Sequence, residues 1–233
     1  VRLIGLTATP YRMKSGTICS PENLLNHVCY ETGVKELINQ GYICPLISKA
    51  GRREVDTSKL HIRNGEFIPS ETEEMMDEDS LVLSACNEIA SYTKDRKSCL
   101  IFAAGIKHAE HIAATLRKEH NAKVECIFGE TSSLFREQYI EDFKSGRIKY
   151  LVNVGVLTTG FDAPNIDCIA LLRPTNSPGL FYQMVGRGLR LSPGKTNCLI
   201  LDFGGNIMRH GPVDSIKIKE PGKGTGEAPA KKC

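Results

Sequence analysis

The 233-residue sequence has few of the features that mark membrane, fibrous or secreted proteins. No uncharged apolar run approaches the roughly 18 residues that a membrane-spanning helix needs. Hydrophobic residues make up 41% and charged residues 24% of the chain, which excludes a disordered, collagen-like or coiled-coil protein. We therefore expect a soluble globular protein, and its length corresponds to about one and a half domains.

The nine cysteines form no C-x-x-C pair, so the sequence predicts neither a disulfide framework nor a complete zinc site. Four of them lie in or beside apolar runs, where cysteine behaves as a small buried hydrophobe: Cys99, Cys126, Cys168 and Cys198. This usage favours a reducing, intracellular compartment, and we expect a cytoplasmic protein.

The formal net charge of +3 hides a gradient along the chain. Residues 1–79 carry 9 basic and 12 acidic groups (−3), residues 80–210 carry 16 and 12 (+4), and residues 211–233 carry 5 and 3 (+2). The middle and the tail are therefore mildly basic. This balance permits contact with nucleic acid through a local patch without requiring it.

The hydrophobic pattern divides the chain into four parts. Residues 1–45 contain an expected strand at 1–10, a loop and a short helix at 33–40. Residues 42–48 are predicted to be extended, residues 49–70 have no hydrophobic period, and we interpret residues 46–79 as a linker. Their acidic run, 71–79, is predicted to be a solvated helix start rather than an interaction patch. Residues 211–233, rich in glycine, proline and lysine, are predicted to be a flexible linker.

Residues 80–210 have a regular alternation of helical and strand patterns. Strands are predicted at 98–103, 123–128, 149–154, 167–172 and 197–203, and helices at 80–92, 106–119, 133–144 and 178–186. The strands are continuous apolar runs, and helices separate most of them, which is typical of an α/β domain whose parallel sheet is buried on both faces. Such sheets bind ligands at the carboxyl ends of their strands. We therefore expect the functional residues in the loops that follow the strands.

The turn after the strand at 149–154 is GVLTTGFDAP, residues 155–164. It places the hydroxyls of Thr158 and Thr159, then Gly160, then the carboxylate of Asp162 at the end of a buried strand. A glycine there allows a ligand close to the backbone, and the carboxylate can accept a hydrogen bond from a ribose hydroxyl. The same residues are also ordinary turn formers, so the spacing alone leaves both interpretations open.

A second group of polar residues lies in QMVGRGLR, residues 183–190. Gln183, Arg187 and Arg190 are spaced i, i+4 and i+7, so they share one face if the helix continues. Two guanidiniums placed in this way can clamp a polyphosphate, although a solvated basic helix end is the simpler interpretation. Gly186 and Gly188 are poor helix formers and favour a segment whose backbone lies close to another surface.

These two motifs, together with TATP (7–10) and LIF (100–102), occur in the order and approximate spacing of motifs III to VI of superfamily 2 helicases. The chain resembles DEAD/DEAH-type helicases, most closely the RadD-like group of bacterial DNA-repair helicases, over nearly all of residues 1–205. The resemblance implies that residues 80–210 are the second RecA-like domain, a three-layer α/β fold. It also implies that residues 1–45 hold the end of a first RecA-like domain and a connector.

The resemblance assigns roles to individual residues. Arg187 and Arg190 match the arginine pair that reaches the γ-phosphate of ATP. Nucleotide-binding positions are implied for Gly160, Asp162 and Gln183. Positions that hold a nucleic-acid backbone are implied for Thr158, Ala104, Gly105, Gly129 and Thr131. Thr7 and Thr9 match the motif that couples the state of the nucleotide to contacts with the strand.

The sequence lacks the motifs that would complete an ATP site. A G-x-x-x-x-G-K-[ST] loop is needed to cradle the phosphates. In GLRLSPGKT (188–196), five residues rather than four separate Gly188 from Gly194, and a strand follows, so we predict an ordinary loop there. No D-E-A-D or D-E-x-H box is present. We expect ATP and Mg²⁺ to be bound mainly by a missing first domain, so that this chain, a piece of a longer protein, has no ATPase activity alone.

No metal site is predicted within the chain. His108 and His111 lie three residues apart on a predicted helix, but no third ligand is evident, so a polar helix face is favoured over a metal pair. Cys233, at the end of the basic linker, is a candidate first ligand of a zinc module beyond it. That idea depends partly on the resemblance, because RadD-like helicases have a C-terminal cysteine cluster.

We therefore predict the C-terminal motor domain of an ATP-dependent helicase or translocase, acting on single-stranded or forked DNA rather than on a membrane. Its partners would be the nucleic acid and the first RecA-like domain. The alternative is a non-catalytic nucleic-acid-binding or scaffold module of a larger repair or restriction complex. A Rossmann-type methyltransferase or dehydrogenase is disfavoured, because no G-x-G-x-x-G follows an early strand.

Overall fold

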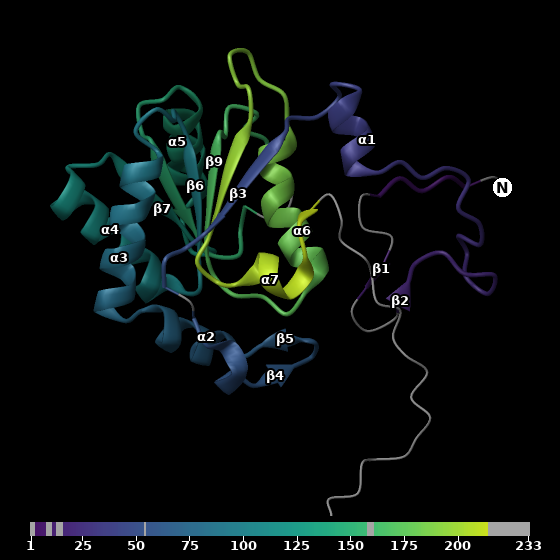
Figure 1. The fold of residues 1–233 in the computed structure, drawn as a ribbon, viewed down its shortest axis with the longest axis horizontal. Coiled ribbons are helices and arrows are strands. Elements are labelled where there is room, and N and C mark those ends of the chain that lie inside the picture. Colours follow the sequence, from purple (N-terminus) through teal and green to yellow (C-terminus); the bar gives the residue numbers. More distant parts are fainter. Residues whose placement is uncertain (1–2, 8–10, 13–15, 54, 158–160, 214–233) are drawn as a thin grey trace, which may run out of the picture.

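The structure, a computed structural model, describes residues 3–7, 11–12, 16–53, 55–157 and 161–213 (Figure 1). Its centre is a six-stranded sheet in which every neighbouring pair is parallel, in the order β3-β10-β9-β6-β8-β7. The strands are β3 (Leu46–Ala50), β6 (Cys99–Ala103), β7 (Val124–Ile127), β8 (Tyr150–Asn153), β9 (Cys168–Leu172) and β10 (Cys198–Asp202). This is an α/β, RecA-like sheet, and five of its strands lie within the predicted ranges.

Helices cover both faces of the sheet and make three layers. One face packs against α3 (Asp79–Tyr92) and α4 (Ile106–His120), and the other against α5 (Ser133–Lys144) and α6 (Pro178–Gly186). Residues of β6 alternate between the two cores: Ile101 packs in the first cluster, and Leu100 and Phe102 in the second. Every residue of the two central strands β6 and β9 is buried, and these two strands are apolar throughout.

The edge strand β3 corrects the prediction of a linker over residues 46–79. Residues 46–50 pair in register with all five residues of β10, from Leu46 opposite Cys198 to Ala50 opposite Asp202. Only Leu46 of this strand is half-buried, and the other four residues are exposed. The sequence pattern predicted extended chain at 42–48, which overlaps β3, but it did not show that this strand joins the sheet, because most of its side chains are exposed.

Residues 55–76, which we call the cap, lie below the carboxyl ends of the strands in Figure 1. The cap contains η1 (Thr57–Lys59), the hairpin of β4 (Ile62–Arg63) and β5 (Glu66–Phe67), and α2 (Pro69–Met76). Glu66 accepts hydrogen bonds from the hydroxyl of Thr175 and the amide of Asn176 in the loop after β9. Arg209, on the short helix α7 (Asn206–His210), lies 5.1 Å from the Phe67 ring and donates to Thr57 Oγ1. The cap is therefore joined to the domain by polar contacts.

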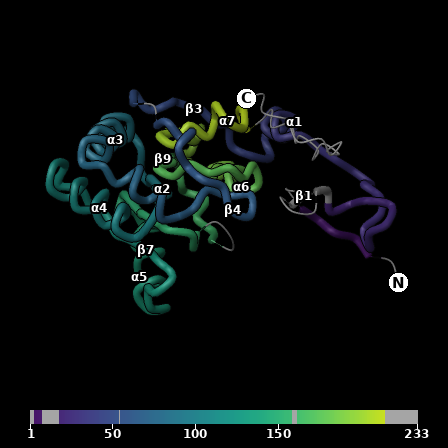
Figure 2. Tube along the Cα trace, turned by 90° about the horizontal axis from the view of Figure 1, so that it is seen from below, coloured from purple at the N-terminus to yellow at the C-terminus, as the bar shows by residue number. Residues whose placement is uncertain are grey.

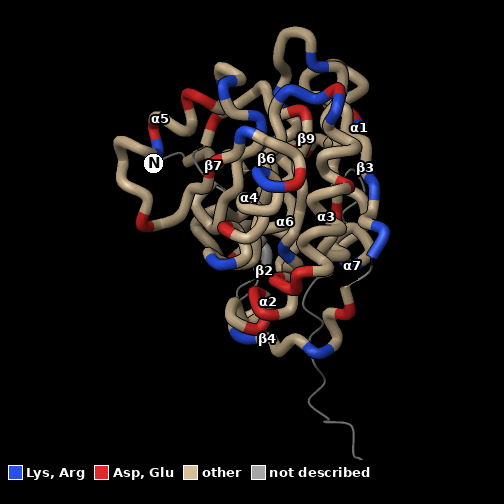
Figure 3. The backbone as a smooth tube through the Cα atoms, turned by 90° about the vertical axis from the view of Figure 1, so that its left-hand side faces the viewer, with Lys and Arg blue, Asp and Glu red and all other residues tan. Residues whose placement is uncertain are grey.

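The acidic run predicted as a solvated helix start spans α2 and the beginning of α3, where Figure 3 shows acidic residues gathered. Part of it is not simply solvated. Asp77 accepts from His111 Nδ1 at 2.9 Å, and Glu73 accepts from the backbone of α4. The run therefore supplies structural contacts that its charge pattern alone did not predict.

The N-terminal part lies to one side of the sheet domain (Figure 2) and contains β1 (Tyr11–Arg12), β2 (Gly16–Thr17) and α1 (Val34–Asn39). The strand expected at 1–10 is not formed at residues 3–7, the described part of that range. Leu3, Ile4 and Leu6 are 57%, 83% and 96% exposed. A strand requires a neighbouring strand to pair its backbone groups, and none of the described residues pairs with this segment.

Candidate active site

The loops expected to bind nucleic acid lie together at one edge of the sheet. Ala104 and Gly105 follow β6, residues 128–131 follow β7, and the segment that leads to Thr158 follows β8. Since β6, β8 and β7 are consecutive neighbours and parallel, their carboxyl ends meet at one edge. Thr158 and Gly160 themselves lie outside the described residues.

The first turn of α4, which follows the loop after β6, already binds a carboxylate of the protein itself, that of Glu73. Glu73 of the cap accepts hydrogen bonds at Oε1 from the amides of Lys107 (2.8 Å) and His108 (3.3 Å), in the first turn of α4. A Cβ placed on Gly105 would lie 2.1 Å from Glu73 Cδ, so a larger residue at this position would displace the Glu73 carboxylate. Helix N-termini favour anions. A nucleic-acid phosphate at this helix end would therefore have to displace Glu73.

An arginine that we did not single out organises the loop after β7. Arg136, on α5, donates through Nη2 to the carbonyls of Phe128 (3.0 Å), Gly129 (3.2 Å) and Thr131 (3.4 Å). The Thr131 hydroxyl accepts from the Phe128 amide at 2.8 Å. A basic residue near the start of a helix interacts unfavourably with the helix dipole. The position of Arg136 near the start of α5 was therefore the sequence signal that this arginine has a specific role.

The two arginines of the 183–190 motif converge on one carbonyl. Arg187 Nη1 donates to Phe161 O at 2.8 Å, and Arg190 Nη1 donates to the same oxygen at 3.0 Å. Arg190 also forms an ion pair with Asp162. The structure thus brings together Arg187, Arg190 and Asp162, three of the residues predicted for the nucleotide.

The helical arrangement expected for this motif is only partly present. Helix α6 ends at Gly186, a 3-10 turn, η2, covers Arg187–Leu189, and Arg190 is extended with φ −72° and ψ 140°. Gln183, half-buried on α6, is therefore not on a continuous helix face with Arg190, which corrects the i, i+4, i+7 prediction. The arginines meet through the Phe161 carbonyl instead.

The electrostatics of the pair suit an anionic ligand. Burial lowers the pKa of Arg187, the charge of Arg190 lowers it further, and Asp162 partly opposes both effects. The Asp162 side chain is 70% exposed and that of Arg190 is 36% exposed. A phosphate oxygen has the same acceptor chemistry as the Asp162 carboxylate, so it can exchange with that carboxylate at the Arg190 guanidinium.

The glycine inside the arginine segment is required by packing against the protein. A Cβ on Gly188 would lie 2.5 Å from Cys198 Sγ and 3.2 Å from Ile169 Cδ1. The sequence predicted that the backbone at these glycines lies close to another surface. At Gly188 that surface is the sheet, through Cys198 and Ile169. Nothing lies within 4 Å of a Cβ placed on Gly186.

Lys195, from the G-K-T run predicted as an ordinary loop, supports the same segment. Its Nζ donates to the carbonyls of Gly188 (2.8 Å), Arg190 (2.8 Å) and Pro164 (3.3 Å). Burial lowers the pKa of Lys195. The lysine therefore contacts the backbone of both segments of the arginine site, a role that the G-K-T pattern did not predict.

The remaining candidates do not gather at this edge. Thr7 is exposed in the N-terminal part, and Thr9 and Cys233 lie outside the described residues. No group of three or more His, Cys, Asp or Glu side chains that could hold a metal ion occurs in the part of the chain that the structure describes. His108 is fully buried, with Nδ1 accepting from the Ala104 amide at 3.2 Å, so it is not part of a polar helix face.

Comparisons with known proteins place these motifs in a family. Residues 82–192 match the family described as "Helicase conserved C-terminal domain". The chain is 30% identical over 210 residues to "Putative ATP-dependent helicase IRC3" of Saccharomyces cerevisiae, and 33% identical over 220 residues to "Putative mitochondrial ATP-dependent helicase irc3" of Schizosaccharomyces pombe. These alignments cover 87% and 90% of this chain but 29% and 34% of the relatives. The chain thus spans about a third of their length.

The fold has a solved counterpart. "The fragment structure of a putative HsdR subunit of a type I restriction enzyme from Vibrio vulnificus YJ016" superposes with a TM-score of 0.64 at 21% identity, over 80% of this chain and 37% of that one. The relatives are thus IRC3-type helicases, with an HsdR subunit similar in fold, and they do not single out the RadD-like group. None of the described helices is long and apolar enough to cross a membrane. Residues 82–192 therefore match a helicase C-terminal domain.

Proposed function

We propose that this chain is the C-terminal motor domain of an ATP-dependent helicase or translocase that acts on DNA. The observation that carries the proposal is the convergence of Arg187 and Arg190 on the Phe161 carbonyl, beside an exposed Asp162. The two guanidiniums and the carboxylate come from the two sequence motifs for which the resemblance implies nucleotide binding. Their arrangement fits one half of a site that closes over a triphosphate.

The chemistry proposed for the arginines is stabilisation of charge. ATP and Mg²⁺ would be held mainly by a first RecA-like domain. Arg187 and Arg190 would reach the γ-phosphate across the cleft, where an arginine of this kind contributes about 10³ to 10⁵ in rate. Asp162 and Gly160, both in the 155–164 turn, would serve the ribose side, and Gln183 of the 183–190 motif is a further proposed nucleotide contact. Binding of ATP would exchange the Asp162 carboxylate at Arg190 for a phosphate.

The nucleic acid would bind at the carboxyl edge of β6, β8 and β7. Thr158, the Ala104–Gly105 loop and the Gly129–Thr131 loop are the proposed contacts, and Arg136 would hold the last loop in shape. Thr7 and Thr9 would couple the state of the nucleotide to these contacts with the nucleic acid. The choice of DNA rests on the resemblance to DNA-repair helicases. Zinc binding by Cys233 has no support from the comparisons and is not part of the proposal.

The test uses the full-length protein. Arg190→Ala is expected to reduce nucleic-acid-stimulated ATPase by about 10³ or more while ATP affinity changes only a few-fold, because the arginine acts mainly in the transition state. Arg63→Ala, which removes an exposed arginine of the cap, is the matched control and should retain turnover. Near-normal turnover by Arg190→Ala would refute the assignment, and no turnover by the unaltered protein would favour the scaffold module. Stimulation by forked DNA, single-stranded DNA and RNA would identify the substrate.

A further inference from the structure

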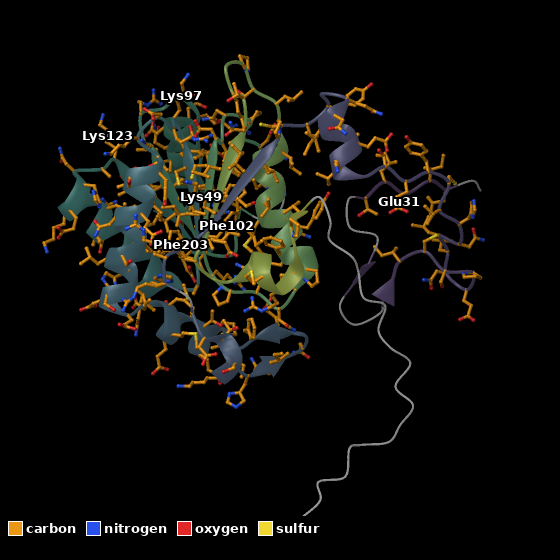
Figure 4. The ribbon with its side chains drawn as sticks, viewed as in Figure 1. Glu31, Lys49, Lys97, Phe102, Lys123 and Phe203 are labelled. Atoms are coloured by element: carbon orange, nitrogen blue, oxygen red, sulfur yellow. The ribbon has the colours of Figure 1, made fainter. Side chains whose placement is uncertain are left out.

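A basic surface lies at the edge of the sheet opposite to the candidate active site, where the strands begin. Lys123 immediately precedes β7, Lys149 immediately precedes β8, and Lys97 lies two residues before β6. The Lys149 amide donates to Lys123 O at 3.2 Å, and the Cys99 amide donates to Lys149 O at 2.8 Å. These lysines therefore start three neighbouring strands. Figure 4 shows Lys97 and Lys123 at the upper left of the domain, away from the cap.

An open groove of about 660 Å³ lies at this edge, between the end of α3, the end of α4 and the start of β8. Four cationic side chains line it: Lys94, Lys123, Arg147 and Lys149. His120, Asn87 and Ser91 add polar groups. None of the twelve described residues that line the groove is Asp or Glu. The groove thus concentrates positive charge that its own lining does not neutralise.

The four cations differ in how they are held. Lys149 Nζ donates to the Thr93 carbonyl and lies 5.6 Å from the centre of the Tyr150 ring, and Arg147 pairs with Asp142, which lies outside the lining. Lys94 and Lys123 are exposed. Two cations are thus fixed by the fold, and two extend toward solvent, where an anionic ligand can recruit them.

We propose that this groove binds the phosphates of a nucleic-acid backbone, as a second contact separate from the carboxyl edge. Lysine acts on phosphate as a flexible point charge and reads no sequence. The Tyr150 ring in the lining is only 5% exposed, so it offers bases little surface for stacking. The groove therefore holds backbone without sequence preference. This inference does not depend on the ATPase activity.

The experiment measures the affinity of the 233-residue chain for a fluorescent polythymidine oligonucleotide over a range of salt concentrations. The test variant is Lys94→Ala/Lys123→Ala. The control is Lys35→Ala/Lys59→Ala, which removes the same charge from exposed lysines outside the groove. Each lost phosphate contact flattens the salt slope of single-strand binding by about 0.7, so we expect a slope lower by about 1.4 and about tenfold or more weaker binding at ~50 mM salt. The control should keep the original slope.

Four results would overturn the proposal. The first is unchanged affinity and salt slope in the groove variant, and the second is an equal loss of affinity in the control variant, which would indicate that only the net charge matters. The other two concern the source of the anion. Competition by polyglutamate as effective as by unlabelled oligonucleotide would indicate an acidic protein, and equal competition by tripolyphosphate would indicate a free phosphate ligand. Circular dichroism of each variant establishes that the fold is retained.

Discussion

Replacing Gly188 by alanine tests whether the arginine site depends on packing against the sheet. The added methyl would lie 2.5 Å from Cys198 Sγ, 3.1 Å from Cys198 Cβ and 3.2 Å from Ile169 Cδ1. Cys198 and Ile169 are fully buried, so neither can turn into solvent. The segment that carries Arg187 and Arg190 must therefore shift outward, or the core must distort.

The expected cost follows from two opposing terms. Overpacking of a filled core costs about 1–3 kcal/mol. The lower backbone entropy of alanine in the unfolded chain returns about 0.4–1 kcal/mol, since Gly188 is not in the left-handed region. We expect Gly188→Ala to lower the free energy of unfolding by about 1–2 kcal/mol. Cys198→Ala removes the sulfur nearest to the new methyl. The loss of unfolding free energy in the double variant should therefore be about 1 kcal/mol smaller than the sum of the losses in the two single variants.

Urea denaturation of the four proteins in this cycle measures the coupling. In full-length protein, Gly188→Ala should also reduce the nucleic-acid-stimulated ATPase, because the two guanidiniums would no longer converge on Phe161 O. A Gly188→Ala protein as stable as the original, or strictly additive losses in the cycle, would refute the packing argument. Reduced stability with unchanged ATPase activity would show that Gly188 matters for packing but not for the positions of the two arginines.

Two further predictions concern the first turn of α4. Glu73→Ala should lower the free energy of unfolding in urea by about 1 kcal/mol, because the amides of Lys107 and His108 lose their acceptor, and Glu73→Gln should cost less; equal stability would contradict this. Burial lowers the pKa of His108 to about 4, below its value of about 6.5 in the unfolded chain, so stability should fall as pH drops through this window, by about 2 kcal/mol between pH 7 and 5. In His108→Asn, urea titrations at both pH values should show most of that dependence removed, and an unchanged dependence would assign it to other groups.

The parts of the fold that the sequence predicted are those with local signals. Helix α6 has the bounds expected from its pattern, Pro178–Gly186, because Ser177 caps its first turn by accepting from the Leu180 amide and proline occupies the first helical position. The buried strands were recognisable because each is apolar on both faces. For such elements, residues close in sequence contain enough information.

The parts that could not be predicted depend on partners distant in sequence. The sequence predicted extended chain at 42–48, but the pairing of residues 46–50 as an edge strand depends on β10, about 150 residues away. Glu73 looked like one carboxylate of a solvated acidic run, and its role depends on the absence of a side chain at Gly105. Lys195 looked like part of an ordinary loop until the fold placed three carbonyls around it. In each case the chemistry was visible in the sequence, but the partner was not.

The segment that carries the two arginines, residues 187–190, is held by hydrogen bonds to its backbone carbonyls, and one of these bonds comes from the N-terminal part of the chain. Lys195 directs Nζ to carbonyls at Gly188 and Arg190, and the Leu189 carbonyl accepts from the Cys44 amide at 2.7 Å. Cys44 lies two residues before β3, on the stretch that leads from α1 into the sheet. A displacement of that stretch would therefore pull directly on the backbone between the two arginines. Because the guanidiniums are placed by this backbone, the coupling would change their reach without any change in the arginine side chains themselves.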